Sequence, residues 1–238
     1  MIRLATTFKL FLAALVAGAA LIGTTADRAQ ALTPEQRDPV TLVSQLTRSI
    51  NTFWAKSFAS WGYRYRAPRL IQWYNTGRAA PVHPDCEDDE LADGFITLNV
   101  AYSNETWGDG NSFYCPADEK LYLDYRFFQF LINSDDYAAG VILAHEWGHH
   151  IQTVLGGNRP RGAGFELEAD CFAGLSSRYG VQTRLLNTGD INWGAHMLSL
   201  VGDTTTGDDA HGTPAQRKGW FLYGYKTGNA RACSGAYR

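Results

Sequence analysis

The sequence predicts a single α+β domain that is mainly helical and carries a small antiparallel sheet. In several long segments, apolar residues recur at steps of three and four, the spacing of one face of an α-helix. Between residues 63 and 123 this spacing gives way to short aromatic and β-branched runs bounded by Gly, Pro, Asn and Asp, which are typical of strands. With 238 residues, 45% of them hydrophobic, the chain can bury a substantial core, and nothing marks a second domain.

The first 31 residues have the pattern of an export signal. Arg3 and Lys9 precede an uncharged apolar run at residues 10–23, and Ala29-Gln30-Ala31 has the small-x-small form of a cleavage site. We therefore expect residues 1–31 to be a signal peptide and the remaining chain, 32–238, to be a domain that is secreted or held in the cell envelope. An uncleaved membrane anchor is the alternative, and membrane contact is expected only in that case. The net charge of -3, without a basic cluster, argues against nucleic acid as a partner.

Helices and strands can be placed along the chain from apolar spacing and capping residues. Helices are expected at residues 34–61, 124–131, 137–155, 165–180 and 192–201, and in a last segment that begins at the capping box of Thr213 and Gln216. Thr33 is expected to cap the first of them. Strands are expected at residues 70–74, 95–102, 113–115 and 121–123, the last two joined as a hairpin.

Four cysteines in a chain expected to be exported predict two disulfides. Three pairings are possible from the sequence. We prefer Cys86 with Cys115, which would staple a loop, and Cys171 with Cys233, which would tie the C-terminus to a central helix. Free buried thiols are the alternative, and the absence of CxxC spacing disfavours a structural zinc site made of cysteines.

The helix expected at residues 137–155 contains the run His145-Glu146-Trp147-Gly148-His149. Residues four apart lie on the same face of a helix, so the two histidines of this run can bind one zinc ion. Its glutamate lies beside them, where it can act as general base toward a metal-activated water. His150 lies about 140° round the helix from His145 and is expected at the surface or in a supporting role. An exposed helix with fortuitous histidines is the alternative for the whole pattern.

A catalytic zinc ion normally has three protein ligands, and the segment Glu166-Leu167-Glu168-Ala169-Asp170 offers the third. Glu166 and Glu168 are rivals because they point about 160° apart on a helix. Asp170 lies one turn after Glu166 on the same face, where it can accept the spare N–H of a ligand imidazole. We therefore expect Zn²⁺ on His145, His149 and Glu166, with Asp170 supporting one of the histidines.

This set of groups fits hydrolysis of a peptide bond in a peptide or protein substrate. Glu146 would take a proton from water and deliver it to the departing amine. The oxyanion that develops needs a further donor, for which we choose His211; His196 and the tyrosines are rivals, and a structural role is the alternative for His211. Two other functions stay open: a non-catalytic zinc-containing envelope protein that binds a peptide or partner, and a zinc amidohydrolase that acts on a cell-wall amide.

The segments HEWGHHIQ, ELEADCFAG, FYCPADEKLYLD and AHGTPAQRKGWFLYGYKTGNARAC together resemble the bacterial putative neutral zinc metallopeptidases, over about residues 54–233. The resemblance implies zinc on His145, His149 and Glu166. It also implies Glu146 as the catalytic base and a zincin-like fold, in which the metal-carrying helices lie beside a small sheet. It supplies no defined substrate. The chain departs from those members that keep an N-terminal membrane helix, because its own start looks cleavable.

Overall fold

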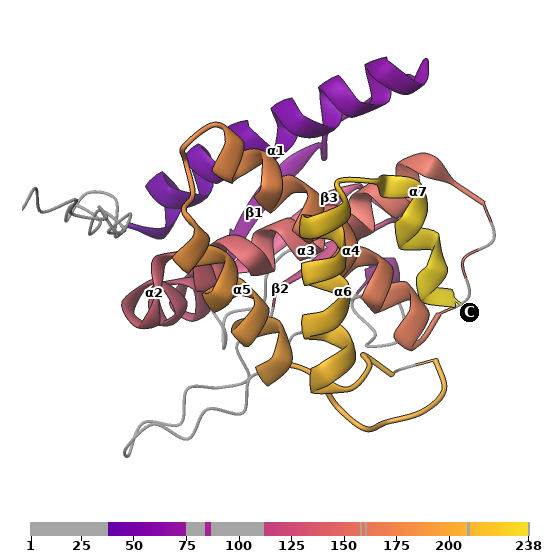
Figure 1. Ribbon diagram of the computed structural model, residues 1–238. Helices are drawn as coiled ribbons and strands as arrows, with labels where there is room; N and C mark the ends of the chain where they lie inside the picture. The colour runs from indigo at the N-terminus through magenta and orange to yellow at the C-terminus, as the bar shows by residue number, and fades with distance from the viewer. Residues whose placement is uncertain are drawn as a thin grey trace, which may run out of the picture.

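The computed structural model describes residues 38–74, 84–86, 112–157, 159, 161–208 and 210–237. Within them the protein is an α+β fold of seven α-helices and one three-stranded sheet, which confirms the predicted class (Figure 1). The export signal expected at residues 1–31 and the strand expected at 95–102 lie outside the described residues.

The helices and strands follow one another in an order close to the predicted one. The helices are α1 (Pro39–Trp61), α2 (Tyr125–Ser134), α3 (Asp136–Leu155), α4 (Ala163–Gln182), α5 (Thr188–Leu200), α6 (Pro214–Thr227) and α7 (Ala230–Cys233). The strands are β1 (Leu70–Tyr74), β2 (Ser112–Cys115) and β3 (Lys120–Asp124), and two short 3₁₀ helices are η1 (Pro84–Cys86) and η2 (Ser234–Tyr237).

The sheet is mixed, with the strand order β1-β3-β2. Strands β2 and β3 form the predicted antiparallel hairpin, in which Phe113 pairs with Tyr122. The antiparallel prediction was wrong for β1, which runs parallel to β3 with Gln72 opposite Tyr122. A parallel pair needs a long connection that returns the chain to the same end of the sheet, and residues 75–119 between these two strands are long enough to do so.

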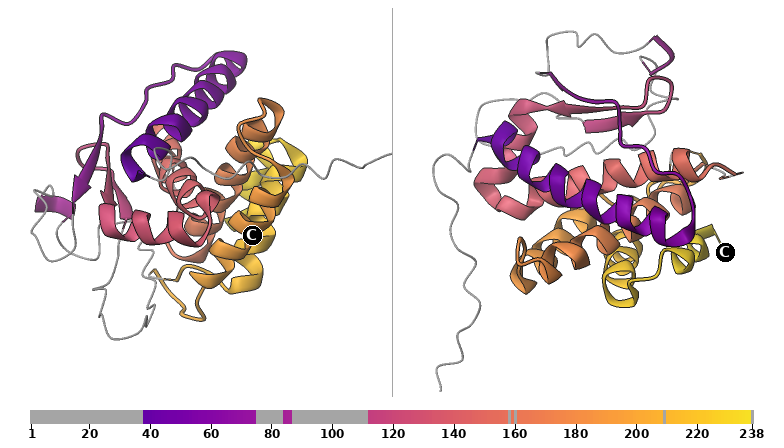
Figure 2. Two further views of the ribbon diagram at one scale, coloured as in Figure 1. Left: turned by 90° about the vertical axis from the view of Figure 1, so that its left-hand side faces the viewer. Right: turned by 90° about the horizontal axis from the view of Figure 1, so that it is seen from above.

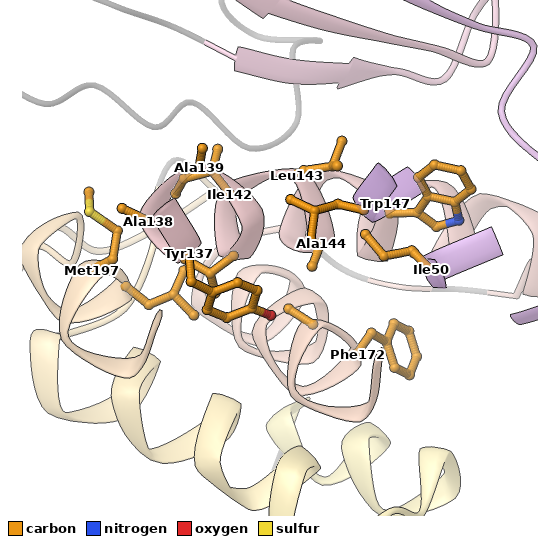
Figure 3. Close-up of a cluster of buried hydrophobic side chains, with 14 of the residues drawn as sticks. Ile50, Tyr137, Ala138, Ala139, Ile142, Leu143, Ala144, Trp147, Phe172 and Met197 are labelled. Carbon is orange, nitrogen blue, oxygen red and sulfur yellow. The ribbon is translucent and has the colours of Figure 1, made fainter. Parts of the chain in front are cut away.

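Helix α3 lies at the centre of the fold. It contacts α1, α2, α4, α5 and strand β2, and Figure 2 shows the sheet on one side of it and α5 and α6 on the other. Its side chains are buried from Tyr137 to Gln152. Figure 3 shows several of its apolar side chains in one cluster with Ile50 of α1, Phe172 of α4 and Met197 of α5. A helix surrounded by protein must be apolar on every side, so any polar side chain on α3 has to find its partners inside the fold.

Polar side chains define the starts of the helices. The capping box of Thr213 and Gln216 is present at α6, as predicted. Helix α5 starts four residues before its expected first residue, 192, because Asn187 and Asp190 form a second capping box that we did not recognise. Asp38 accepts the backbone N–H of Thr41 and caps α1, which begins at Pro39; the cap expected at Thr33 lies outside the described residues.

Small residues allow α3, α4 and α6 to approach one another closely. A Cβ atom added to Gly148 of α3 would lie 2.8 Å from the carbonyl oxygen of Ala169 in α4. Between α4 and α6 the approach is closer still: a Cβ atom on Gly224 would lie 2.0 Å from the carbonyl oxygen of Cys171. The backbones of α3 and α4, and those of α4 and α6, are therefore almost in contact.

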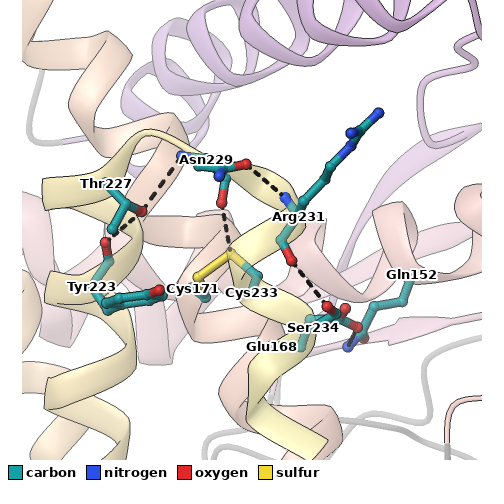
Figure 4. Close-up of a disulfide and its surroundings, with 9 residues drawn as sticks. All are labelled: Gln152, Glu168, Cys171, Tyr223, Thr227, Asn229, Arg231, Cys233 and Ser234. Carbon is teal, nitrogen blue, oxygen red and sulfur yellow. Dashed lines mark hydrogen bonds between the residues drawn. A yellow bond between two sulfur atoms is a disulfide. The ribbon is translucent and has the colours of Figure 1, made fainter.

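The two disulfides are those preferred from the sequence. Cys86 is joined to Cys115, and Cys171 of α4 is joined to Cys233 of α7 across a separation of 62 residues (Figure 4). The second one holds the C-terminal end of the chain against α4, the helix that also packs against α6.

Among the described helices, none has the length and apolar character needed to cross a membrane.

The close approach of α4 and α6 gives a direct test of the packing. Gly224→Ala should lower the free energy of unfolding by about 2 kcal/mol or more, because the new methyl group must displace backbone. Gly219→Ala on the same helix is the matched control, since a Cβ atom there meets nothing within 4 Å. That change should stabilise the protein by up to about 1 kcal/mol through helix propensity. Denaturant unfolding measures both, and equal effects of the two substitutions would contradict the packing.

Candidate metal centre

Three donor side chains converge where α3 meets the first turn of α4. Nε2 of His145 lies 3.0 Å from Nε2 of His149 and 3.2 Å from Oε2 of Glu166, and His149 Nε2 lies 3.4 Å from Glu166 Oε1. One ligand atom of each residue falls within 4.8 Å of the others, and all three residues are buried. A tetrahedral zinc ion with bonds of about 2.0–2.1 Å separates its donors by about 3.3 Å, so the observed spacing fits zinc.

Unpartnered oxygens at the same place also fit a metal ion. Among the described residues, both carboxyl oxygens of Glu146 are buried without a hydrogen-bond partner, and Oε2 of Glu166 has ion-pair contacts with His145 at 3.2 Å and Arg217 at 3.7 Å but no hydrogen bond of good geometry. Buried polar atoms almost always have partners, and an ion is one of the recognised explanations for exceptions. The nitrogen, nitrogen and oxygen donor set is one that zinc accepts.

His145 is held from behind by two charged residues. Its Nδ1 lies 2.8 Å from Oδ1 of Asp170, the contact expected from the sequence. The guanidinium of Arg217, on α6, donates to both oxygens of this carboxylate at 2.9 Å. Arg217 is fully buried and also lies 3.7 Å from Glu166. Because Asp170 accepts at Nδ1, the Nε2 atom of His145 is the one directed at the centre.

His149 is held in the same way by a different acceptor. Its Nδ1 lies 2.8 Å from Oε1 of Gln152, one turn further along α3. The ring of Phe165 stacks on the imidazole, with 4.9 Å between ring centroids and 15° between planes. Nε2 of His149 therefore faces the centre as well.

The charges at the site are balanced in the metal-free protein. Burial and Arg217 act to lower the pKa of His145, but Asp170 and Glu166 outweigh them and raise it to about 9. Burial lowers the pKa of His149 to about 4. Burial would raise the pKa of Glu166 and of Asp170, but their cationic neighbours hold both below the ordinary value. Two cations, His145 and Arg217, thus face two carboxylates, and neutral His149 accepts a hydrogen bond from His145.

Glu146 differs from the other carboxyl groups. Burial and the nearby charge of Glu166 raise its pKa well above the ordinary value, despite the opposing charges of His145 and Arg217. Without a metal ion, burial therefore favours the protonated form of Glu146. An added cation would favour its ionised form, which is the form that accepts a proton.

The remaining candidates pair with residues other than the three donors. His150 was expected at the surface or in a supporting role; it is buried and bonds to the hydroxyl of Tyr114 at 3.2 Å and the carbonyl of Arg66 at 2.9 Å. Glu168 is buried and bonds to Gln152. His211 bonds through Nδ1 to Oδ2 of Asp203 at 2.8 Å.

Sequence reasoning missed two residues that contact the donors, Arg217 and Gln152. Arg217 lies on a helix with many exposed residues, so the neighbouring sequence does not distinguish it from a surface arginine. Gln152 did offer one. It lies three residues after His149, a spacing that brings side chains together on a helix, and glutamine can accept an imidazole N–H.

The chain is similar to a described family and to uncharacterized bacterial proteins. The sequence profile described as "putative neutral zinc metallopeptidase" matches residues 101–161 and 161–236. The uncharacterized protein YpfJ of Escherichia coli is 25% identical over 235 residues, covering 86% of this chain and 74% of its own. The uncharacterized protein Rv2575 of Mycobacterium tuberculosis is 34% identical over 156 residues, covering 51% of this chain and 53% of its own. No solved structure matches the chain.

The raised pKa of His145 predicts how the metal-free protein depends on pH. Its folded pKa of about 9 exceeds the unfolded value of 6.5, so its stabilising effect is complete below pH 6.5 and is lost as the pH rises through 9. In the presence of a chelator, the free energy of unfolding should therefore fall by on the order of 3 kcal/mol between pH 6.5 and pH 9. The raised pKa of Glu146 acts in the same direction.

Asp170→Asn supplies the control, since it removes the carboxylate that stabilises protonated His145. The fall with pH should be clearly smaller in this variant, whatever its absolute stability. Denaturant titrations at the two pH values measure the slope. A wild-type stability that does not change over this range would contradict the proposed protonation of the site.

Proposed function

The chain belongs to the putative neutral zinc metallopeptidase family, and from this premise we propose that it is a zinc-dependent peptidase that hydrolyses peptide bonds in a peptide or protein substrate. The observation that carries the proposal is the convergence of His145, His149 and Glu166 within 4.8 Å. Glu146 lies on α3 together with the two histidines. Two ligands from one helix and a third from the next leave room in a tetrahedral site for a non-protein ligand.

The three donors would hold the zinc ion through Nε2 of each histidine and the carboxylate of Glu166. When bound, the ion supplies a Lewis acid that polarises the scissile carbonyl and makes a water molecule acidic near neutral pH. Asp170 and Gln152 keep both imidazoles directed at the ion by accepting their Nδ1–H groups. Arg217 compensates the buried negative charge of Asp170 and Glu166.

Glu146 would act as the general base and then as the general acid. Its carboxylate takes the proton of the attacking water and passes it to the amine that leaves. The buried, unpartnered oxygens of Glu146 suit this task, because no hydrogen bond from the described residues has to be broken before the proton moves. A base in a water-poor site also has a pKa that the cation can shift into the working range.

His211 would donate a hydrogen bond to the oxyanion that develops on the scissile carbonyl. Two observations support this role. Oδ2 of Asp203 lies 2.8 Å from Nδ1 of His211 and thereby orients the ring. Gly212, the next residue, lies so near Leu167 that an added Cβ would be 3.1 Å from it, which brings this turn against α4 beside Glu166.

We further propose that residues 1–31 are an export signal and that the domain, residues 32–238, works outside the cytoplasm, secreted or within the cell envelope. The two disulfides support this, because such bonds persist in oxidising compartments.

Two substitutions separate catalysis from metal binding. Glu146→Gln should keep zinc and lower peptide hydrolysis at least about 100-fold, because the ligands remain while the base is lost. Glu166→Ala should release zinc, because only two protein ligands remain. Zinc content by elemental analysis and digestion of a broad peptide library, with a chelator control, measure both effects.

Full hydrolysis by the Glu146→Gln variant would refute the assigned base. A wild-type protein that binds zinc but cleaves nothing in the library would favour the non-catalytic, partner-binding alternative.

The role of His211 has its own test. His211→Gln should lower kcat by about 100-fold or more and leave zinc affinity unchanged, as expected for a donor that acts only on the transition state. His196→Gln is the matched control, since His196 is an exposed residue of α5. If the His196 variant loses activity while the His211 variant keeps it, the assignment is wrong.

A further inference from the structure

We propose that Gln152 is a positioning residue that sets two of the three zinc ligands relative to each other, and that Glu168 keeps it in the required orientation. The inference rests on the proposed zinc site. It concerns residues that have no expected metal contact themselves. In the segment from Glu166 to Asp170, Glu166 is the expected metal ligand and Asp170 supports His145. Glu168 has neither of these two roles.

The side-chain amide of Gln152 has one possible orientation in this environment. One of its ends lies 2.8 Å from the carbonyl oxygen of Phe165 and 3.0 Å from Oε2 of Glu168. A backbone carbonyl can only accept a hydrogen bond, so this end must be the NH₂ group. The same oxygen of Glu168 also accepts from Nε of Arg159 at 2.8 Å, which identifies it as an acceptor too.

The orientation of the amide determines the tautomer of His149. With the NH₂ group turned toward Phe165 and Glu168, Oε1 faces Nδ1 of the imidazole at 2.8 Å. An amide oxygen can only accept, so Nδ1 carries the proton and Nε2 has the free lone pair. The lone pair of Nε2 is the one that a metal ion needs. A reversed amide would present NH₂ to Nδ1 and would favour the tautomer whose Nε2 carries a proton and cannot bind metal.

The same side chain also sets the distance between α3 and α4. Gln152 belongs to α3, whereas its acceptors Phe165 and Glu168 belong to the first two turns of α4. Phe165 immediately precedes the ligand Glu166 and stacks on the ring of His149. A single amide therefore fixes the ring of one ligand and the backbone next to another. Gln152 and Glu168 are both buried, and Figure 4 shows them side by side at α4.

The two histidines are thus supported by separate chains of contacts. His145 is held by Asp170 and Arg217, and His149 by Gln152, Glu168 and Arg159. The first chain uses a charged acceptor and reaches α6. The second uses a neutral acceptor and reaches residue 159, in the connection between α3 and α4. Glu168 contributes through Gln152.

The test uses substitutions that leave all three ligands in place. Gln152→Leu removes the amide and keeps a similar volume. Glu168→Gln replaces an acceptor by an amide of the same shape, which can pair with Gln152 in either orientation. Glu119→Gln is the matched control, because Glu119 is also paired with an arginine, Arg66, but lies in the turn between β2 and β3.

Zinc affinity is measured by competition with a chromophoric chelator, and the tautomer of His149 by nitrogen-15 NMR of the metal-free protein. Gln152→Leu should weaken zinc binding by about 10- to 100-fold, as is usual when the support of a metal ligand is removed. Glu168→Gln should weaken it by up to about 10-fold and should increase the population of His149 protonated at Nε2. The Glu119 variant should match the wild type in both measurements.

Thermal unfolding of each metal-free variant shows whether it folds, and Gln152→Glu is the second choice if the leucine variant does not. That variant places a carboxylate oxygen against the carbonyl of Phe165 and should also weaken zinc binding. Folded variants that bind zinc within twofold of the wild type and keep its tautomer would overturn the inference. If the wild type binds no zinc, the proposed function fails instead, and the NMR measurement still decides the orientation of Gln152.

Discussion

The carboxylate of Asp170 is the interaction on which the site depends. It lies on α4, accepts from His145 of α3 and receives two hydrogen bonds from Arg217 of α6, so that one side chain connects three helices. All three groups are fully buried. Removing either partner would leave an uncompensated charge in the interior, which typically costs about 3–5 kcal/mol. This network therefore requires the three helices to keep their relative positions, and it directs His145 toward the candidate metal centre at the same time.

Close backbone packing makes such a network possible. Gly148 lets α4 approach α3, and Gly174 and Gly224 let α6 approach α4, where Cβ atoms would lie 2.0 Å from carbonyl oxygens. The disulfide between Cys171 and Cys233 holds the end of the chain on the same helix. The glycines and the disulfide thus hold α3, α4 and α6 close enough for their charged side chains to form hydrogen bonds. The surrounding core of α3 excludes water and strengthens the electrostatic interactions.

Much of the site could be predicted because it depends on local geometry. The four-residue spacing of His145 and His149, and of Glu166 and Asp170, is set by the helix itself. The hairpin of β2 and β3 and the capping box of α6 are also local features. Arg217 could not be predicted, because its burial depends on the packing of α6 against α4. The parallel pairing of β1 with β3 is likewise a property of the whole chain path, since an isolated strand carries no mark of its direction.

The central claim is that His145, His149 and Glu166 together bind one zinc ion, and X-ray diffraction recorded on both sides of the zinc absorption edge tests it most directly. The account predicts one anomalous peak about 2.0–2.1 Å from Nε2 of both histidines and about 2.0–2.2 Å from a carboxylate oxygen of Glu166. A zinc peak elsewhere, or one bound by the two histidines with Glu166 out of reach, would contradict it.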